Sequence, residues 1–330
     1  MKVHDLDDRR NRGGARVHPL GMQPLLSREV QPPRPLSVAS TVAGLGGAAT
    51  RQQLLFLGLS GFDLTTAVRS GEVIRIRQAR YILRSTAPDV SAAVRVGGML
   101  AGPSAARSYG LWGGIDRRVH VSVGDHGSRL RTNVPPSFAG RGALRSDRSG
   151  HTVVLHWIRG GAVRELGAEC WRVEIGSCLQ QMVEWSSDET ALACLDTALQ
   201  IGLISRAELL VLFAGEPVRA RLIASQARLG SDSGAESMVS RRLGRAGLVL
   251  DQQVRIAGVG RVDMRVRGTR IIVEVDGRTY HEDPAAFEED RRRDAELVAR
   301  GYVVVRLSYL RVMNDWAWCQ RMVLAAVASH

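Results

Sequence analysis

Lysine is almost absent from this sequence of 330 residues. Lys2 is its single lysine, so arginine supplies the other 44 of the 45 basic side chains. Cysteine is scarce too, with four residues and no C-x-x-C pair, which excludes a zinc ribbon and a disulfide-stapled fold and favours a reducing, cytoplasmic setting. No run approaches about eighteen consecutive apolar residues, so we expect no membrane span. Residues 1–36 lack the apolar stretch of a secretory signal.

Positive charge is in excess but unevenly placed. The net charge is +12 and the isoelectric point is near 10.7, which favours a polyanionic partner. Residues 37–150 hold 15 arginines against 6 acids, whereas residues 231–330 hold 16 against 14. The basic character therefore belongs mainly to the N-terminal part. Arginine-rich codon usage in a GC-rich genome is an alternative explanation for the abundance of arginine.

The order of predicted elements divides the chain into four segments. We expect a disordered basic tail over 1–36, a winged-helix DNA-binding domain over 37–88, a mixed α/β segment over 89–230 and an α/β nuclease core over 231–330. The last boundary lies in Gly-Ser-Asp-Ser-Gly at 230–234, a composition typical of linkers. The predicted fold class is thus a multidomain protein that combines α+β and α/β parts.

Short helices followed by a hairpin characterise the N-terminal part. Helices are expected near 42–45, 50–57 and 62–70, and two alternating strands over 73–77 and 79–84. Three helices followed by a hairpin are typical of a winged helix. Exposed arginines at the end of the third helix and along the hairpin would contact DNA phosphates: Arg69, Arg75, Arg77, Arg80 and Arg84. An arginine-rich chain exposes arginine everywhere, so this pattern alone does not decide the matter.

The C-terminal part predicts the order α-β-β-β-α-β. The helices are expected over 235–246 and 284–300, and the strands over 254–256, 259–267, 270–276 and 302–307. Glycines at 247, 268, 277 and 301 stand where this order requires turns.

Two carboxylates face each other on the predicted hairpin of this part. If Gly268-Thr269 is a two-residue turn, Met264 pairs with Val273, and Asp263 lies opposite Glu274. Asp276 follows two residues later and projects from the same face as Glu274. Like charges placed opposite each other destabilise a sheet, and burial increases that cost.

A divalent cation would relieve this repulsion. Hard oxygen ligands select magnesium or manganese, so we predict a Mg²⁺ (or Mn²⁺) site held by Asp263, Glu274 and the carbonyl oxygen of Val275. The competing interpretation is that Arg261 or Arg265 neutralises the acids on a solvated face.

Further groups are expected around the same face. Glu236 lies on the preceding helix, and His281 follows the Asp276-Gly277 turn, where it would act as a base. Arg291 and Arg293 fall on the last long helix beside Asp290. A structural role for a lone histidine and a solvated face for the helix charges remain the alternatives.

The stretch from Arg261 to Arg306, with Val273-Glu-Val-Asp-Gly277 and Phe287-Glu-Glu-Asp-Arg-Arg-Arg-Asp294, resembles a known domain. It is similar to the endonuclease-like domain related to very-short-patch mismatch-repair nucleases, within the PD-(D/E)xK, restriction-endonuclease-like superfamily. The resemblance covers roughly residues 231–325. It implies catalysis by five residues, of which the first two bind metal: Asp263, Glu274, Glu236, Asp276 and His281.

One departure from that pattern concerns the missing lysine. The superfamily's third position usually carries lysine, whereas this chain has Asp276 there. The resemblance then implies that His281 or metal-activated water takes the water-activating role. Arg291, Arg293 or Arg306 would clamp phosphate. A catalytically inactive domain also stays open.

The N-terminal part has a resemblance of its own. Residues 46–83, together with Pro103-Ser-Ala-Ala-Arg-Ser-Tyr-Gly-Leu-Trp112 and 194–209, resemble AbiEi-type antitoxins. The resemblance implies DNA binding, often autoregulatory, and a cognate toxin as partner.

These observations together predict a winged helix that delivers a Mg²⁺-dependent endonuclease to double-stranded DNA. The alternative is a non-catalytic antitoxin or repressor that uses the nuclease fold as a scaffold. RNA or branched DNA as substrate remains open, as does the oligomeric state.

Overall fold

The structure is a computed structural model that describes residues 37–124, 130, 143–146, 152–158, 169–276 and 284–330. It separates residues 1–36 from a unit formed by residues 37–330. The expected disordered tail and His281 lie outside the described residues. Within the described ranges, no helix has both the length and the apolar character needed to cross a membrane.

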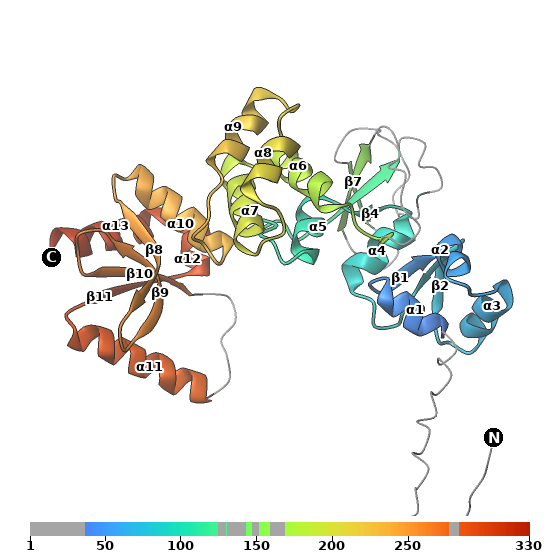
Figure 1. The fold of residues 1–330 in the computed structure, drawn as a ribbon, viewed down its shortest axis with the longest axis horizontal. Coiled ribbons are helices and arrows are strands. Elements are labelled where there is room, and N and C mark those ends of the chain that lie inside the picture. Colours follow the sequence, from blue (N-terminus) through green and yellow to red (C-terminus); the bar gives the residue numbers. More distant parts are fainter. Residues whose placement is uncertain (1–36, 125–129, 131–142, 147–151, 159–168, 277–283) are drawn as a thin grey trace, which may run out of the picture. The chain divides into compact units, whose positions relative to one another are not determined.

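The N-terminal part consists of three helices and a small sheet (Figure 1). Its elements are α1 (Val38–Gly44), β1 (Ala48–Thr50), α2 (Arg51–Phe56), α3 (Gly61–Arg69), β2 (Ile74–Arg77) and β3 (Arg80–Ile82). The strands form an antiparallel sheet in the order β1-β3-β2. Capping boxes begin α2 and α3, since Thr50 pairs with Gln53 and Ser60 with Asp63. The sequence predicted the helices and the hairpin but not β1.

The middle part combines a mixed sheet with helices. Its elements are α4 (Pro88–Val96), β4 (Met99–Leu100), α5 (Gly102–Ser108), β5 (Val119–Gly124), β6 (Ala143–Ser146), β7 (Thr152–Ile158), α6 (Ile175–Trp185), α7 (Asp188–Gln200), α8 (Arg206–Leu212) and α9 (Val218–Gln226). The sheet order is β4-β5-β7-β6, with β5 and β7 parallel. Every residue of α7 from Ala191 to Leu199 is buried, so this helix forms the centre of the part.

The C-terminal part contains the predicted α-β-β-β-α-β order and two further helices. Its elements are α10 (Gly234–Arg245), β8 (Leu250–Ile256), β9 (Gly260–Val266), β10 (Ile271–Asp276), α11 (Pro284–Ala299), β11 (Val303–Ser308), α12 (Tyr309–Asn314) and α13 (Trp316–Ala328). The sheet order is β11-β10-β9-β8, in which β10 and β11 are parallel and the other pairs antiparallel. The last two helices were not predicted.

This C-terminal sheet is covered on both faces (Figure 1). On one face, Leu243 of α10 and Val323 of α13 pack with Met264 and Val273. On the other face, Leu297 of α11 packs with a separate group that contains Val262 and Ile272. Glu274 is two residues from Ile272 on β10, so it lies on the α11 side of the sheet.

Helices α7 and α10 are joined by buried polar contacts across the 230–234 segment. Asp196 of α7 is 1% exposed and accepts hydrogen bonds from Arg241 at 2.7–3.0 Å and from the Ser237 hydroxyl at 2.6 Å. Glu189 of α7 pairs with Arg242 at 2.6–2.7 Å. The first helix of the C-terminal part is therefore anchored to the middle part.

Candidate active site

The β9–β10 hairpin has the register predicted from the sequence. Arg265 pairs with Ile272, and Met264 pairs with Val273. The next positions in the same register are Asp263 and Glu274. At this position a side chain makes the contact between the strands: the Asp263 carboxylate accepts a hydrogen bond from the Val275 N–H at 2.8 Å. The Asp263 carboxylate is thus fixed against the backbone of β10, next to Glu274.

The turn of this hairpin differs from the predicted one. Gly268-Thr269 was expected to be a two-residue loop, but the strands end at Val266 and begin again at Ile271. The Thr269 N–H donates to the Val266 carbonyl at 3.1 Å, so Arg267 and Gly268 occupy the centre of the turn. Gly268 has φ +77°, which a type II turn requires at its third position. The strand register is still the predicted one, because four residues, 267–270, separate the two strands and keep Val266 opposite Ile271.

Glu274 is the more enclosed acid of the pair, at 8% exposure. One carboxylate oxygen lies 3.2 Å from Nη2 of Arg306, and the other lies 3.6 Å from Nη2 of Arg293. Burial raises the pKa of Glu274, the Arg306 charge lowers it, and the Asp263 charge raises it further. Burial likewise raises the pKa of Asp263, against the Val275 hydrogen bond. The charge of Asp263 therefore disfavours ionisation of its neighbour Glu274.

Glu236 joins them from the first turn of α10. Its carboxylate is held by the backbone N–H of Asp232 at 3.0 Å and by the side-chain amide of Gln253 at 2.8 Å. Burial, followed by the charge of Asp263, raises the pKa of Glu236 to about 7. Gln253 has φ +51°, a backbone conformation that is uncommon for residues other than glycine. Its neighbours on β8, Gln252 and Val254, pair with Met264 and Val262 of β9, the two residues that flank Asp263.

The raised pKa of Glu236 makes stability depend on pH. The folded protein keeps this proton until pH 7, whereas the unfolded chain releases it near pH 4.5. The protonated Glu236 therefore contributes fully to the free energy of unfolding below about pH 4.5. This contribution, on the order of 3 kcal/mol, is lost as pH rises through 7. We expect Glu236→Gln to lose less stability than wild type between pH 5 and pH 8. Urea unfolding in a chelator measures this, and equal losses in both proteins would contradict it.

The two arginines expected to neutralise the acid pair both have other ion-pair partners, although the charge of Arg261 still lowers the pKa of Asp263. Arg265 pairs with Asp251 at 3.2 Å, and Arg261 pairs with Asp232. Burial also raises the pKa of Asp276, whose carboxylate lies 3.6 Å from Arg306. The cations beside Glu274 come from α11 and β11.

The two arginines of α11 that were predicted to contact phosphate lie in different environments. Arg293 turns inward and donates to the carbonyl of Arg261 at 2.7 Å, which places it beside Glu274. Arg291 is exposed. The default expectation of a solvated charged face therefore does not hold for Arg293, nor for Asp290, which accepts from Arg306 at 2.8 Å.

The N-terminal arginines also differ among themselves. Arg69, Arg75 and Arg84 are exposed, and Arg80 is half-buried. Arg77 was expected on the outer face of the hairpin, but its guanidinium donates to the Val96 carbonyl at 2.7 Å, at the end of α4. Carbonyls at a helix C-terminus attract cations, which explains this position.

The residues around Asp263 fit a hard divalent cation in their chemistry. Buried Glu236 and Glu274 and half-buried Asp263 all have raised pKa values and supply oxygen donors and negative charge. Within the part of the chain that the structure describes, no three His, Cys, Asp or Glu side chains already converge to hold a metal ion. A bound ion would therefore require these side chains to draw closer.

One comparison with known proteins, a family model, points to the same segment. The family model REase_MTES_1575 matches residues 236–327. A solved structure titled "Homing Endonuclease I-Bth0305I Catalytic Domain" is 21% identical and covers 29% of this chain and 95% of its own, with a TM-score of 0.26. No curated protein matches the chain. The family match thus places a similarity to restriction-endonuclease-like proteins in the C-terminal part.

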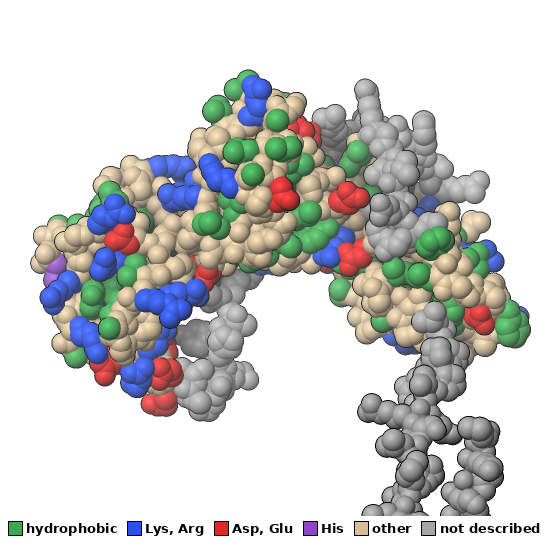
Figure 2. Space-filling view, in the orientation of Figure 1, with side chains coloured by type: hydrophobic (Ala, Val, Ile, Leu, Met, Phe, Trp, Pro, Cys, Tyr) green, Lys and Arg blue, Asp and Glu red, His purple; other side chains and the backbone are tan. Residues whose placement is uncertain are grey.

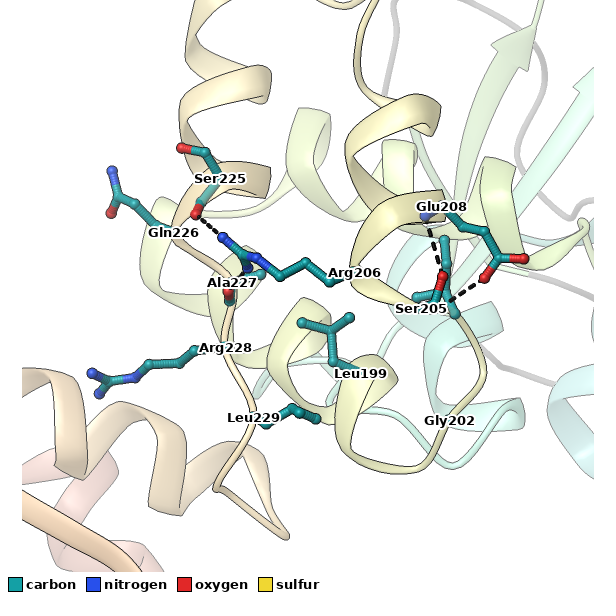
Figure 3. Close-up of a pocket in the computed structure, with 11 residues that line it drawn as sticks. Leu199, Gly202, Ser205, Arg206, Glu208, Ser225, Gln226, Ala227, Arg228 and Leu229 are labelled. Carbon is teal, nitrogen blue, oxygen red and sulfur yellow. Dashed lines mark hydrogen bonds between the residues drawn. The ribbon is translucent and has the colours of Figure 1, made fainter.

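A pocket of about 730 Å³ lies elsewhere, among α7, α8 and the segment after α9 (Figure 3). Arg206 closes one side by donating to the Ser225 carbonyl at 2.7 Å and to the Ala227 carbonyl. Hydrophobic side chains also gather on the surface over α8 and α9 (Figure 2). The pocket shares no residue with the carboxylate group, so it has no part in the chemistry argued below.

Three residues near the site were not identified from the sequence: Asp232, Gln253 and Asp294. Asp294 had a signal, since Asp290, Asp294 and the buried Leu297 have the spacing of one helix face. Asp232 lies in a linker-like segment, and Gln253 owes its position to an unusual backbone conformation. Neither of these two has a local pattern that distinguishes it.

Proposed function

We propose that this protein is a Mg²⁺-dependent endodeoxyribonuclease that hydrolyses phosphodiester bonds in double-stranded DNA. The observation that carries the proposal is that half-buried Asp263 lies beside buried Glu274 and near enough to buried Glu236 for its charge to raise both pKa values, within the segment that the family model REase_MTES_1575 matches. Buried like charges are costly unless a cation compensates them.

Each acid has a distinct part in this proposal. Asp263 and Glu274, with the Val275 carbonyl, would hold the ion, which supplies Lewis acidity toward the phosphate and a more acidic water. Glu236, with a pKa of about 7, holds or releases a proton near neutral pH. His281 is proposed as a further proton acceptor, since it follows β10 closely in the sequence.

The test is conversion of supercoiled plasmid to the nicked form by the purified protein. We expect nicking with Mg²⁺ or Mn²⁺ and none in a chelator. A protein that binds duplex DNA tightly in a salt-sensitive way, yet never nicks it with either ion, would contradict the proposal.

We propose that the N-terminal part is a winged helix that binds the duplex. Its element order and antiparallel sheet support this, as do exposed arginines on α3 and β2. Arg69→Ala with Arg75→Ala is expected to weaken duplex affinity and to reduce the slope of log K against log salt by about one per lost contact. Fluorescence anisotropy at several salt concentrations measures both quantities.

Arg321→Ala is the matched control for that pair. Arg321 is exposed on α13, which packs on the sheet face opposite α11. This substitution removes an arginine charge without touching α3 or β2, so affinity and slope should stay near wild type. An equal effect of the control would mean that net charge alone governs binding.

The second candidate function is a non-catalytic antitoxin or repressor with a cognate toxin as partner. It is favoured by the lack of lysine and by the absence of a preassembled metal-ligand group among the described side chains. Duplex binding without cleavage is its expected result.

A further inference from the structure

Arg306 occupies the junction of β10, β11 and α11. In the parallel pairing of β10 with β11, Arg306 is the direct partner of Glu274. Adjacent strands lie about 4.8 Å apart, so the two side chains share one face of the sheet beneath α11. This places a guanidinium beside the most enclosed acid of the proposed metal site.

Four carboxylates surround this guanidinium. The closest are Asp294 at 2.6 Å and Asp290 at 2.8 Å, both on α11, followed by Glu274 at 3.2 Å and Asp276 at 3.6 Å on β10. The group carries three more negative charges than positive ones. Arg306 is thus the main compensation for the acids on this side of Glu274, with Arg293 contributing at 3.6 Å.

These contacts leave Arg306 little freedom. Nη1 and Nη2 both donate to Asp290, and Nη2 also donates to Asp294. The remaining donor, Nε, is buried and has no partner among the described residues. Reaching a phosphate at the surface would require Arg306 to give up three charge-assisted hydrogen bonds. The expectation that Arg306 clamps phosphate is therefore not what this geometry favours.

We propose that Arg306 is a fixed internal cation that positions Glu274 and balances the charge of the site, in a chain whose catalytic part has no lysine. Asp290 and Asp294 hold the guanidinium from α11. Asp276 is then an anchor for Arg306. This inference rests on the proposed nuclease function and makes Arg306 a positioning residue, because it acts through Glu274.

Removing this cation has two opposite consequences. Without Arg306, Glu274 loses its orienting partner, so the rate of Mg²⁺-dependent nicking in Arg306→Gln should fall by about 10- to 100-fold. At the same time, the uncompensated carboxylates attract divalent ions more strongly. Mn²⁺ affinity should therefore rise by on the order of tenfold. A purely structural defect would lower both quantities.

A second variant returns the positive charge from the neighbouring strand. Asp276→Lys combined with Arg306→Gln places an ammonium on β10, two residues from Glu274. It should recover most of the nicking rate and bring Mn²⁺ affinity back toward wild type. Asp294→Lys combined with Arg306→Gln has the same net charge as the first double variant, but its ammonium lies on α11, away from Glu274. It should therefore recover much less of the nicking rate. Arg311→Gln, at an exposed pair with Asp315 on α12, should change neither quantity.

The measurements are plasmid nicking and calorimetric Mn²⁺ titration of the full chain, with folding checked by thermal unfolding. Unchanged Mn²⁺ affinity in folded Arg306→Gln, or equal rescue by the two lysine variants, would overturn the inference. If wild-type protein binds Mn²⁺ but never nicks DNA, the nuclease proposal fails, and the titration still decides the role of Arg306.

Discussion

Replacing Asp263 by Asn or Glu274 by Gln is expected to reduce metal-dependent plasmid nicking by about 100-fold or more, the scale of loss for a group that stabilises charge in the transition state. Both substitutions keep the size of the side chain but remove a charge from the proposed metal site. Each should also weaken Mn²⁺ binding, because carboxylate oxygens are its expected ligands. A nicking assay and a calorimetric titration on the same preparations measure the two effects.

Asp251→Asn is the control for these substitutions. Asp251 lies on β8 and pairs with Arg265 and Arg267, and it is not among the proposed site acids Asp263, Glu274 and Glu236. Its loss removes one negative charge from the same sheet, so nicking should remain within about twofold of wild type, as for a solvated ion pair. Retained nicking in Asp263→Asn and Glu274→Gln would place the chemistry elsewhere or assign it to a contaminant.

Asp196→Ala is expected to lower the free energy of unfolding by about 3–5 kcal/mol, the usual loss when one partner of a buried ion pair is removed. Asp196 is 1% exposed and its partner Arg241 is 10% exposed, so solvent screens neither charge. The substitution also leaves the Ser237 hydroxyl and the Arg228 N–H without their acceptor. Urea unfolding at constant pH measures the change.

Asp188→Ala is the matched control on the same helix. Asp188 begins α7 and pairs with Arg219, but it is 62% exposed and its partner 49%. Surface pairs of this kind contribute about 0–1 kcal/mol. A loss for Asp196→Ala no greater than that of the control would show that α7 and α10 do not depend on the buried pair.

The Asp196 contacts have a consequence for the site. Ser237 follows Glu236 directly on α10, and Asp232, which donates to Glu236, accepts from Gln200 of α7 at 2.8 Å. The middle part therefore fixes the helix turn that carries a site acid. The sequence indicated a linker at 230–234. No local sequence pattern predicted these contacts, because the residues that make them are more than thirty positions apart in the chain.

Local rules were sufficient for the hairpin. Taking Gly268-Thr269 as the turn predicted the pairing of Met264 with Val273, which the structure has, and therefore the juxtaposition of Asp263 and Glu274. The turn itself was predicted wrongly, because a glycine with positive φ serves in several turn types. Helix starts at Thr50 and Ser60 followed equally local capping chemistry.

The sequence by itself determined the order of elements, the strand register and the two facing acids, since these depend on side-chain alternation and on neighbours a few residues apart. The tertiary structure alone decided which cations accompany those acids. Arg261 and Arg265 are the nearer arginines in sequence, yet Arg306 and Arg293 lie beside Glu274. The reason is physical: parallel pairing of β10 with β11 and the packing of α11 bring distant charges together, and no local pattern encodes that distance.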